Sequence, residues 1–248
     1  MTSTTQTLPS SVAAPKAVHA PSVAAPKAAP APGAVRSLRA VRMLNVVVAA
    51  IGLVVTAPLM LVVAVLVKLS SKGPVFYTQP RVGIDRRAGD ATPEQLARRR
   101  HDAGGRVFRI YKFRTMSADS DRAGQVWASK TDPRITRIGG ILRKYRLDEL
   151  PQLWNVLRGD MNIVGPRPEQ PGIFTDLREQ VERYPLRQKV LPGITGWAQV
   201  NHHYDQCIDD VRKKVEYDLE YIERRSLVQD IKIMARTIPV MLGRKGAV

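Results

Sequence analysis

The chain has 248 residues, 44% of them hydrophobic, which is enough to bury the core of one sizeable domain and excludes a chain that is disordered throughout. Its formal net charge of +17 predicts an anionic partner, and charge alone leaves open whether that partner is nucleic acid, an anionic membrane surface or a phosphorylated small molecule. Cys207 is the only cysteine and the four histidines show no metal-ligand spacing, so an intrachain disulfide is excluded and a zinc site is not expected.

Residues 1–34 predict a disordered N-terminal tail. They consist largely of Ala, Pro, Ser, Val and Thr, and the heptapeptide SVAAPKA occurs twice, starting at Ser11 and at Ser22. The many prolines prevent a continuous helix, and the segment has too little bulky apolar surface to offset the entropy lost on ordering. It also lacks the basic start and apolar centre of a secretory signal.

Residues 35–72 predict a membrane segment with basic flanks. Val46 to Val67 is an uncharged run of 22 residues, which as a helix spans roughly 33 Å, against about 30 Å for the hydrocarbon core of a bilayer. Pro58 removes a helical hydrogen bond near the middle of the run, and the positive-inside rule gives no direction because both flanks are basic. The pattern leaves open a spanning helix and a re-entrant hairpin whose two ends lie on one face of the membrane.

Residues 73–248 predict a folded domain. A short β run at 75–78 precedes a polar, arginine-rich stretch at 84–106 that is typical of a surface insertion. Residues 107–113 alternate in the manner of a strand, and Lys112 and Arg114 are expected to share one face of it. This pair indicates either a solvated strand face or a site for an anion.

The chemically most informative stretch runs from residue 143 to 169. A helical pattern at 135–145 is amphipathic and suits a membrane surface, and a second helix is expected to start at Asp148. Asp148 and Glu149 therefore have two interpretations: they cap that helix and complement its dipole, or they are the acids of a phosphate site beside Arg143. Carboxylates serve as nucleophiles or as ligands of hard cations, and arginines match phosphate oxygens.

The remaining chain predicts a mixture of short strands, turns and helices. Residues 162–165 are expected to form a strand that leads into Arg167, which is flanked by Pro166 and Pro168. The prolines restrict the backbone, and a rigid arginine needs an anionic target. Residues 192–200 predict a packed, turn-rich loop, whereas 209–225 and 227–242 show helical spacing, and the second of these helices suits a membrane surface.

Three long blocks follow the membrane segment in a fixed order: YKFRTM at 111–116, LDELPQLWNVLRGDMNIVGPRPE at 147–169 and PGITGWAQVN at 192–201. In these blocks the chain resembles the bacterial sugar transferases, the monotopic phosphoglycosyl transferases of exopolysaccharide and glycan assembly. The resemblance covers about residues 42–242. It implies an α+β, mostly helical, monotopic membrane protein with one re-entrant helix, broken at Pro58, and with amphipathic surface helices.

The resemblance also implies an activity. Such a protein transfers a sugar 1-phosphate from a nucleotide sugar, expected to be a UDP-sugar, to polyprenol (undecaprenyl) phosphate on the cytoplasmic face of the bacterial inner membrane. Asp148 is then the nucleophile that attacks the sugar-bearing phosphorus and becomes a covalent aspartyl phosphosugar, and Glu149 holds magnesium or orients the pair. By the same resemblance Asp148 and Glu149 ligate Mg²⁺, while Lys112, Arg143 and Arg167 bind the phosphates.

The chain departs from the family pattern at two positions. Ala57 precedes Pro58 where the family has a serine, so Thr56 is expected to satisfy the backbone carbonyls that the proline frees. Asn45 stands where the family commonly has an aspartate, which weakens the expected anchoring at the membrane entry.

The competing hypothesis is a basic, membrane-associated binding or scaffold protein without catalysis. The charge of +17 favours it, but it leaves Asp148 and Glu149 without a role. With the transferase hypothesis, nucleic acid is not an expected partner, membrane lipids are, and the sequence specifies neither the sugar nor the oligomeric state.

Overall fold

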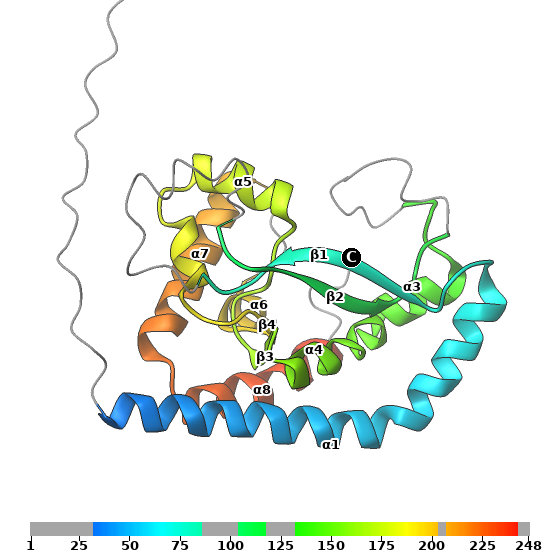
Figure 1. Ribbon diagram of the computed structural model, residues 1–248. Helices are drawn as coiled ribbons and strands as arrows, with labels where there is room; N and C mark the ends of the chain where they lie inside the picture. The colour runs from blue at the N-terminus through cyan, green and yellow to red at the C-terminus, as the bar shows by residue number, and fades with distance from the viewer. Residues whose placement is uncertain (1–31, 86–103, 118–131, 203–206, 243–248) are drawn as a thin grey trace, which may run out of the picture.

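The structure, a computed structural model, describes residues 32–85, 104–117, 132–202 and 207–242. Nearly all of the predicted tail and most of the predicted insertion, residues 86–103, lie outside these ranges, so both stay predictions. Helices make up most of the described chain and two small sheets complete it (Figure 1), which confirms the α+β, mostly helical class.

Each of the two sheets has two strands. β1 (Phe76–Val82) pairs antiparallel with β2 (Val107–Phe113) along its whole length, so the predicted strand at 107–113 is confirmed and the run at 75–78 is the start of a longer strand. β3 (Asn162–Val164) pairs parallel with β4 (Gly193–Thr195), so part of the predicted loop at 192–200 is a strand. The parallel pair brings the segment after β3 beside the segment after β4.

Helices surround these sheets. The helix predicted at 135–145 is confirmed as α3, whose N-cap residue Thr136 accepts a hydrogen bond from the Gly139 amide, and the helices predicted at 209–225 and 227–242 are confirmed within a residue or two. No elements were predicted for residues 171–189, which form a helix and a 3₁₀ turn. In chain order the elements are α3 (Arg137–Lys144), η2 (Leu147–Glu149), α4 (Gln152–Arg158), α5 (Pro171–Gln180), η3 (Tyr184–Lys189), α6 (Trp197–Asn201), α7 (Ile208–Arg224) and α8 (Leu227–Leu242).

The apolar segment lies within a long helix, α1 (Pro32–Ser70), which begins inside the range predicted for the tail. Its stretch Arg39–Ser70 is long and apolar enough to cross a membrane, and among the described helices it alone meets that test. The helix is continuous through Pro58 and bends in its C-terminal part, the effect expected of a missing helical hydrogen bond (Figure 1). The predicted break is therefore a bend, and the two halves do not fold back on each other as a hairpin.

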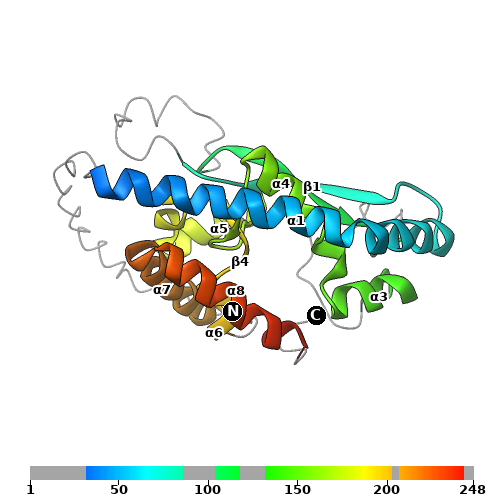
Figure 2. The same ribbon diagram turned by 90° about the horizontal axis from the view of Figure 1, so that it is seen from below.

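Both halves of α1 pack against the same folded domain. Val41 and Ala49 are buried on the N-terminal side, and Val63 and Val67 are buried on the C-terminal side against Phe113 of β2 and Leu142 of α3. The opposite face is apolar and exposed. Seen from below, α1 runs beside α8 across the base of the molecule (Figure 2), and α8 adds further exposed apolar side chains, Val228, Ile231 and Ile238.

Polar contacts hold both ends of α1. Arg42 donates to the Val156 carbonyl over 2.7 Å and to those of Leu157 and Met161, which lie at and just beyond the end of α4. Asn45 donates to the Val41 carbonyl and accepts from the Ile163 amide. An amide side chain therefore ties α1 to β3 at the position where the family commonly has an aspartate. At the other end, Arg114 donates to the carbonyls of Val67, Ser71 and Lys72 and so caps α1.

Two expectations for this region are wrong. Arg114 lies beyond the end of β2 and caps α1, so it does not share an anion site with Lys112. Thr56 donates to the Gly52 carbonyl over 2.6 Å, whereas the carbonyl freed by Pro58 belongs to Val54, four residues before the proline.

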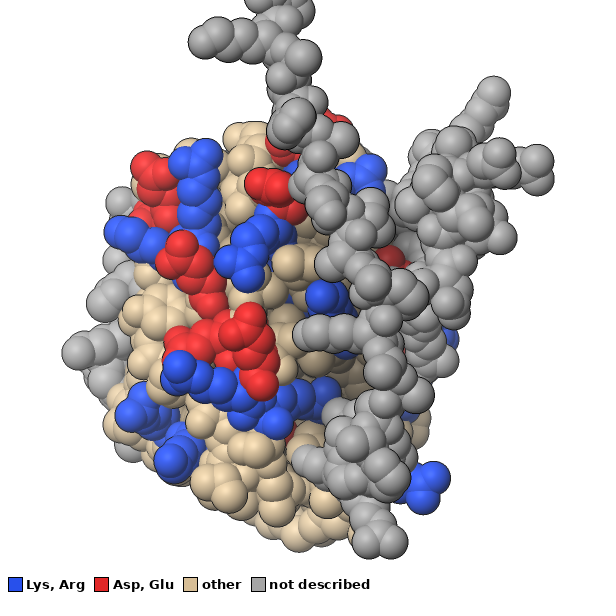
Figure 3. Space-filling view, turned by 90° about the vertical axis from the view of Figure 1, so that its left-hand side faces the viewer, with Lys and Arg blue, Asp and Glu red and all other residues tan. Residues whose placement is uncertain are grey.

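The end of the molecule formed by α5 and α7 is a mixed-charge surface. Figure 3 shows basic and acidic side chains interspersed on it. Exposed ion pairs on α7 contribute to this surface, Arg212 with Asp209 at 2.9 Å and Arg224 with Glu220 at 2.8 Å. Paired charges of both signs are typical of a solvated face.

Candidate active site

The adjacent acids Asp148 and Glu149 lie in η2, a single 3₁₀ turn between α3 and α4. The turn follows Arg146, whose φ of 57° is the left-handed conformation that a non-glycine residue rarely adopts. Strain of this kind persists where the surrounding structure enforces it, and it is frequent at functional sites. In a 3₁₀ turn consecutive side chains point about 120° apart, so the two buried carboxylates face different surroundings.

The prediction that an α-helix starts at Asp148, with Asp148 as its cap, is wrong. α4 starts at Gln152, and its N-cap residue is Pro151. The chain before α4 instead forms three-residue bonds, from the Glu149 amide to Arg146 and from the Leu150 amide to Leu147. Side chains, and not a helix N-terminus, must therefore provide the positive charge beside Asp148.

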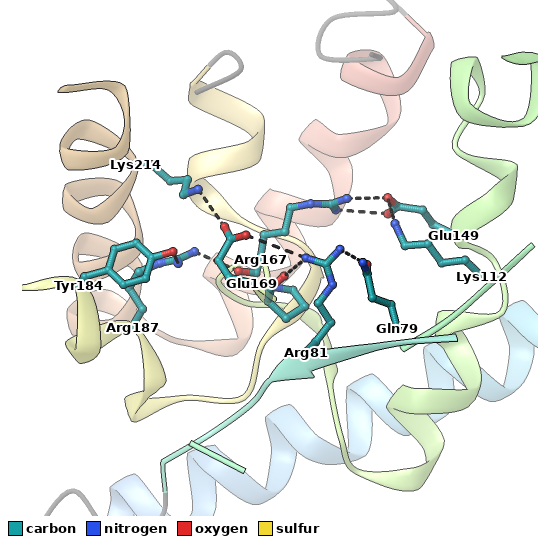
Figure 4. A network of polar contacts seen from close by, with 10 residues as sticks. Gln79, Arg81, Lys112, Glu149, Arg167, Glu169, Tyr184, Arg187 and Lys214 are labelled. Atoms are coloured by element: carbon teal, nitrogen blue, oxygen red, sulfur yellow. Dashed lines mark hydrogen bonds and ion pairs between the residues drawn. The ribbon is translucent and has the colours of Figure 1, made fainter. Parts of the chain in front are cut away.

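Glu149 is held by cations from three parts of the chain, and Figure 4 shows two of them, Lys112 and Arg167. Its Oε1 accepts from Arg167 Nη2 at 2.8 Å and from Lys112 Nζ at 3.2 Å, and Arg146 Nη1 lies 3.4 Å from the same oxygen. Its Oε2 accepts from Arg167 Nη1 at 3.4 Å. The structure thus brings together four of the predicted site residues, Asp148, Glu149, Lys112 and Arg167.

Asp148 differs from its neighbour in having an unsatisfied oxygen. Its Oδ1 is buried and has no hydrogen-bond partner among the residues that the structure describes, although a buried carboxylate oxygen normally accepts at least one bond. Such an orphaned acceptor marks a place that a ligand, an ion or a reacting group can fill.

The two acids also differ in acidity. Burial raises the pKa of Asp148, with the Lys112 charge opposing this shift and the Glu149 charge reinforcing it. Burial also acts to raise the pKa of Glu149, but Arg167 and Lys112 outweigh it and hold that pKa well below its usual range. Neighbouring acids whose surroundings push their pKa values apart are typical of a site in which each has its own role.

The predicted phosphate-binding residue Arg143 is not part of this contact set. Its Nε donates to Thr115 Oγ1 over 2.9 Å, and within the described residues it makes no hydrogen bond or ion pair with either acid. Its charge nevertheless acts on Asp148, since it is among the charges that lower the pKa of that acid. Its position depends on α3, where a Cβ on Gly139 would lie 1.9 Å from the Thr115 carbonyl oxygen, so only glycine allows this close approach.

Sequence reasoning missed two basic residues near the acids. Arg146 lies three residues before Glu149, and this spacing is a signal for a local ion pair. Arg81 lies on β1 and donates to the Pro168 carbonyl beside Arg167. No local sequence signal identifies a contact across 87 residues.

The acids offer a partial set of magnesium ligands. Mg²⁺ is commonly held by one or two carboxylates together with substrate phosphates and water. The orphaned Asp148 oxygen fits this donor set, whereas both oxygens of Glu149 are engaged by cations. The described ranges hold no group of three or more side chains that can hold a metal ion. Of the two acids, Asp148 therefore fits the role of magnesium ligand, and the phosphates of a bound substrate would have to supply further ligands.

Comparison with known proteins agrees with this site. The sequence profile described as bacterial sugar transferase matches residues 36–244. The chain belongs to the bacterial sugar transferase family. One similar relative is the UDP-N-acetylgalactosamine-undecaprenyl-phosphate N-acetylgalactosaminephosphotransferase of Aeromonas hydrophila, which is 43% identical over 83% of this chain and 44% of its own length.

Two further relatives of this bacterial sugar transferase differ in length. The UDP-glucose:undecaprenyl-phosphate glucose-1-phosphate transferase of Xanthomonas campestris is 43% identical over 81% of this chain and 38% of its own length. A putative undecaprenyl-phosphate N-acetylgalactosaminyl 1-phosphate transferase of Bacillus subtilis is 38% identical over 75% of this chain and 82% of its own length. The chain thus spans less than half of the first two relatives and most of the third.

Proposed function

We propose that the protein transfers a sugar 1-phosphate from a nucleotide sugar, a UDP-sugar by analogy with its relatives, to undecaprenyl or a similar polyprenol phosphate, and so initiates exopolysaccharide or glycan assembly. The names of its relatives support the donor and the acceptor. The observation that carries the proposal is the orphaned oxygen of Asp148 beside Glu149, whose own oxygens are held by three cations.

The reaction has two displacements at one phosphorus. In the first, an Asp148 oxygen attacks the sugar-bearing phosphorus, the bond to the bridging diphosphate oxygen breaks, and the nucleoside monophosphate leaves. In the second, a phosphate oxygen of the polyprenol phosphate attacks the same phosphorus, which breaks the aspartyl bond and releases a polyprenol diphosphate sugar. The first step converts the Asp148 carboxylate into the covalent intermediate and the second step restores it, so no further reactant is required.

The cations beside the acids neutralise the phosphates. Arg167, whose side chain is 33% exposed, reaches Glu149 from the solvent side, so a phosphate can compete for it, whereas Lys112 is 18% exposed and lies deeper. Glu149 keeps these cations in place before substrate arrives, which avoids reorganisation during the reaction. A magnesium ion, held by Asp148 and the donor phosphates, would supply further charge neutralisation.

We also propose that α1 enters and leaves the cytoplasmic membrane on its cytoplasmic face. Its two halves pack on one domain, and its apolar outer face is exposed. A straight crossing would carry one of those halves, and the domain surface that covers it, through the bilayer. The exposed apolar residues of α8 extend the same base, which is the arrangement expected of a surface helix.

Release of the nucleoside monophosphate tests the activity. Purified protein with a panel of UDP-sugars and undecaprenyl phosphate is expected to release UMP with one of them, and without acceptor to release one UMP per protein and gain the mass of one phosphosugar. Asp148→Asn should reduce turnover by at least about 10³-fold and abolish the mass gain, because the nucleophile is lost. Asp209→Asn, an exposed carboxylate on α7, is the control. Full turnover by Asp148→Asn excludes the covalent route.

Cysteine labelling tests the topology. In a Cys207→Ser background, Leu38→Cys and Lys72→Cys place single thiols before and after the apolar segment. Both are expected to react with a membrane-impermeant maleimide in inside-out vesicles and to be protected in right-side-out vesicles. Reaction of the two thiols on opposite sides would show a spanning helix.

A further inference from the structure

Arg167 belongs to a segment, residues 166–169, whose backbone is held along its whole length. Each of its four consecutive carbonyl groups accepts a hydrogen bond from a different donor residue. The bonds run from the Gly193 amide to Pro166 (2.9 Å), from Arg187 Nη2 to Arg167 (3.0 Å), from Arg81 Nη1 to Pro168 (3.1 Å) and from the Val82 amide to Glu169 (2.9 Å). The donors come from β1, η3 and β4, so the segment is tied to three elements.

The bond to the Arg167 carbonyl comes from Arg187, each of whose three guanidinium nitrogens donates a hydrogen bond. Arg187 uses three nitrogens for three partners: Nε donates to Asp218 at 2.7 Å, Nη1 to the Tyr184 hydroxyl at 2.8 Å, and Nη2 to the Arg167 carbonyl. Arg187 and Asp218 are each only 2% exposed, so this ion pair is not available to substrate. The planar guanidinium fixes the directions of all three bonds, which an ammonium group cannot do.

The backbone contact holds the peptide from which the Arg167 side chain extends toward Glu149 (Figure 4). The prolines restrict the backbone of Arg167 to the extended region, and the bond to its carbonyl limits the rotation that remains within that region. Rotation there moves the guanidinium away from Glu149, 2.8 Å from it in the structure, and away from a phosphate bound beside Asp148. A misplacement of about 1 Å in a positioning group can cost up to about 100-fold in rate.

We propose that Arg187 is a positioning residue: through the Arg167 carbonyl it aims the Arg167 guanidinium at the phosphate site, with Asp218 of α7 and Tyr184 holding Arg187 in turn. The proposal rests on the proposed transferase function. It makes a buried ion pair, remote from the acids along the chain, part of the machinery that binds the transferring phosphate.

Arg187→Lys tests the proposal, because lysine keeps the charge beside Asp218 but cannot also reach Tyr184 and the Arg167 carbonyl. Its kcat/KM for UMP release is expected to fall about 10-fold. A residue that acts only through Arg167 has nothing left to position when Arg167 is truncated. In an Arg167→Ala background the same change should therefore cost less than about 2-fold, the non-additivity expected of coupled residues.

A purely structural role gives a different result. Arg187→Lys would then lower activity by the same factor in both backgrounds, and that outcome overturns the proposal. Arg224→Lys, which alters an exposed ion pair on α7, is the matched control and should leave kcat/KM unchanged in both. All variants are compared at a temperature at which circular dichroism shows them folded.

Two safeguards keep the test decisive. If Arg187→Lys does not fold, Tyr184→Phe removes only the hydroxyl that accepts from Nη1; a loss of about 3-fold that disappears with Arg167→Ala supports the proposal, and wild-type activity or an additive loss overturns it. If the wild-type protein releases no UMP, the transferase proposal fails on its own. The same cycle measured on the Kd for UDP then decides the positioning role.

Discussion

Two glutamates, Glu149 and Glu169, lie on either side of Arg167, and they differ in the exposure of their partners (Figure 4). Glu149 is held by Arg167 and Arg146, whose side chains are 33% and 34% exposed, and it adjoins the orphaned oxygen of Asp148. Glu169 pairs with Lys214 at 3.0 Å and lies 4.0 Å from Arg81, and neither of these cations exceeds 15% exposure.

Ion pairs between a glutamate and basic side chains therefore serve two purposes in this molecule, binding at Glu149 and structural support at Glu169. Burial acts to raise the pKa of Glu169, but Lys214, Arg187 and Arg81 outweigh it and hold that pKa at about 2. Its cations are closed off, so the pairs tie β1 and α7 to the 166–169 segment. At Glu149 two of the three cations, Arg167 and Arg146, reach solvent, and an incoming phosphate can take over part of their bonding. Solvent access, and not the identity of the charged groups, separates a binding site from a structural tie.

Truncating the shared arginine should give the largest effect on activity. Arg167→Ala is expected to reduce kcat/KM for UMP release by about 10²–10³-fold, because it removes a preorganised cation from the transferring phosphate. Its free energy of unfolding should change by less than about 1 kcal/mol, since the side chain is one-third exposed and Glu149 keeps two cations. Urea unfolding in detergent measures the second quantity. A loss of stability in proportion to the loss of activity would contradict the conclusion that Arg167 serves phosphate binding, whereas the cations around Glu169 serve stability.

A change among the little-exposed ion pairs on the Glu169 side should mainly reduce the stability of the protein. Asp218→Ala leaves the Arg187 charge buried without its carboxylate, which is expected to lower the free energy of unfolding by about 3–5 kcal/mol. Asp209→Ala breaks an exposed pair on the same helix and should cost no more than about 0.5 kcal/mol. Equal effects of the two changes, measured by urea unfolding in detergent, would show that burial does not decide the role of the ion pairs in α7.

The smallest expected effect is a shift of pH dependence. The proposed mechanism requires ionised Asp148, so it predicts that kcat/KM is lost as pH falls through the pKa of this acid, which burial and the Glu149 charge raise. Glu149→Gln removes the negative neighbour and frees Lys112 and Arg167 to act on Asp148. Both changes lower that pKa, so the acid limb of the kcat/KM profile should move to lower pH. Glu216→Gln, exposed on α7, should leave the limb in place, and a limb that stays fixed in Glu149→Gln argues against Asp148 as the ionising group.

Much of the site around Glu149 could be predicted from the sequence, because its residues lie within short, contiguous sequence motifs. The acids, Lys112 and Arg167 lie in contiguous blocks, and the structure brings them into contact. One detail, the helix start at Asp148, was wrong, because the amides of Glu149 and Leu150 make three-residue bonds and the α-helix begins only at Gln152. The phosphate-binding role of Arg143, whose side chain donates to Thr115, stays a prediction.

The Glu169 side could not be predicted, because its members come from β1, η3 and α7 and lie as far apart as residues 81 and 218. One signal was present in the helical pattern. Asp218 follows Val211 and Val215 at helical spacing, so it falls on the apolar stripe of α7 and not on its charged face. A carboxylate on such a stripe indicates a buried cation, although the spacing cannot say which one.

The way α1 is fastened has a consequence for handling the protein. Arg42 satisfies carbonyls at the end of α4, and Ala49 and Val67 fill two of the apolar clusters. Deleting residues 32–70 to obtain a soluble enzyme would therefore remove one wall of the domain and uncover apolar surface beside the acids. Lipid or detergent is needed on one side of the helix only, so a lasting soluble form calls for polar substitutions at exposed positions such as Val54, Val55 and Leu61, with the helix itself kept.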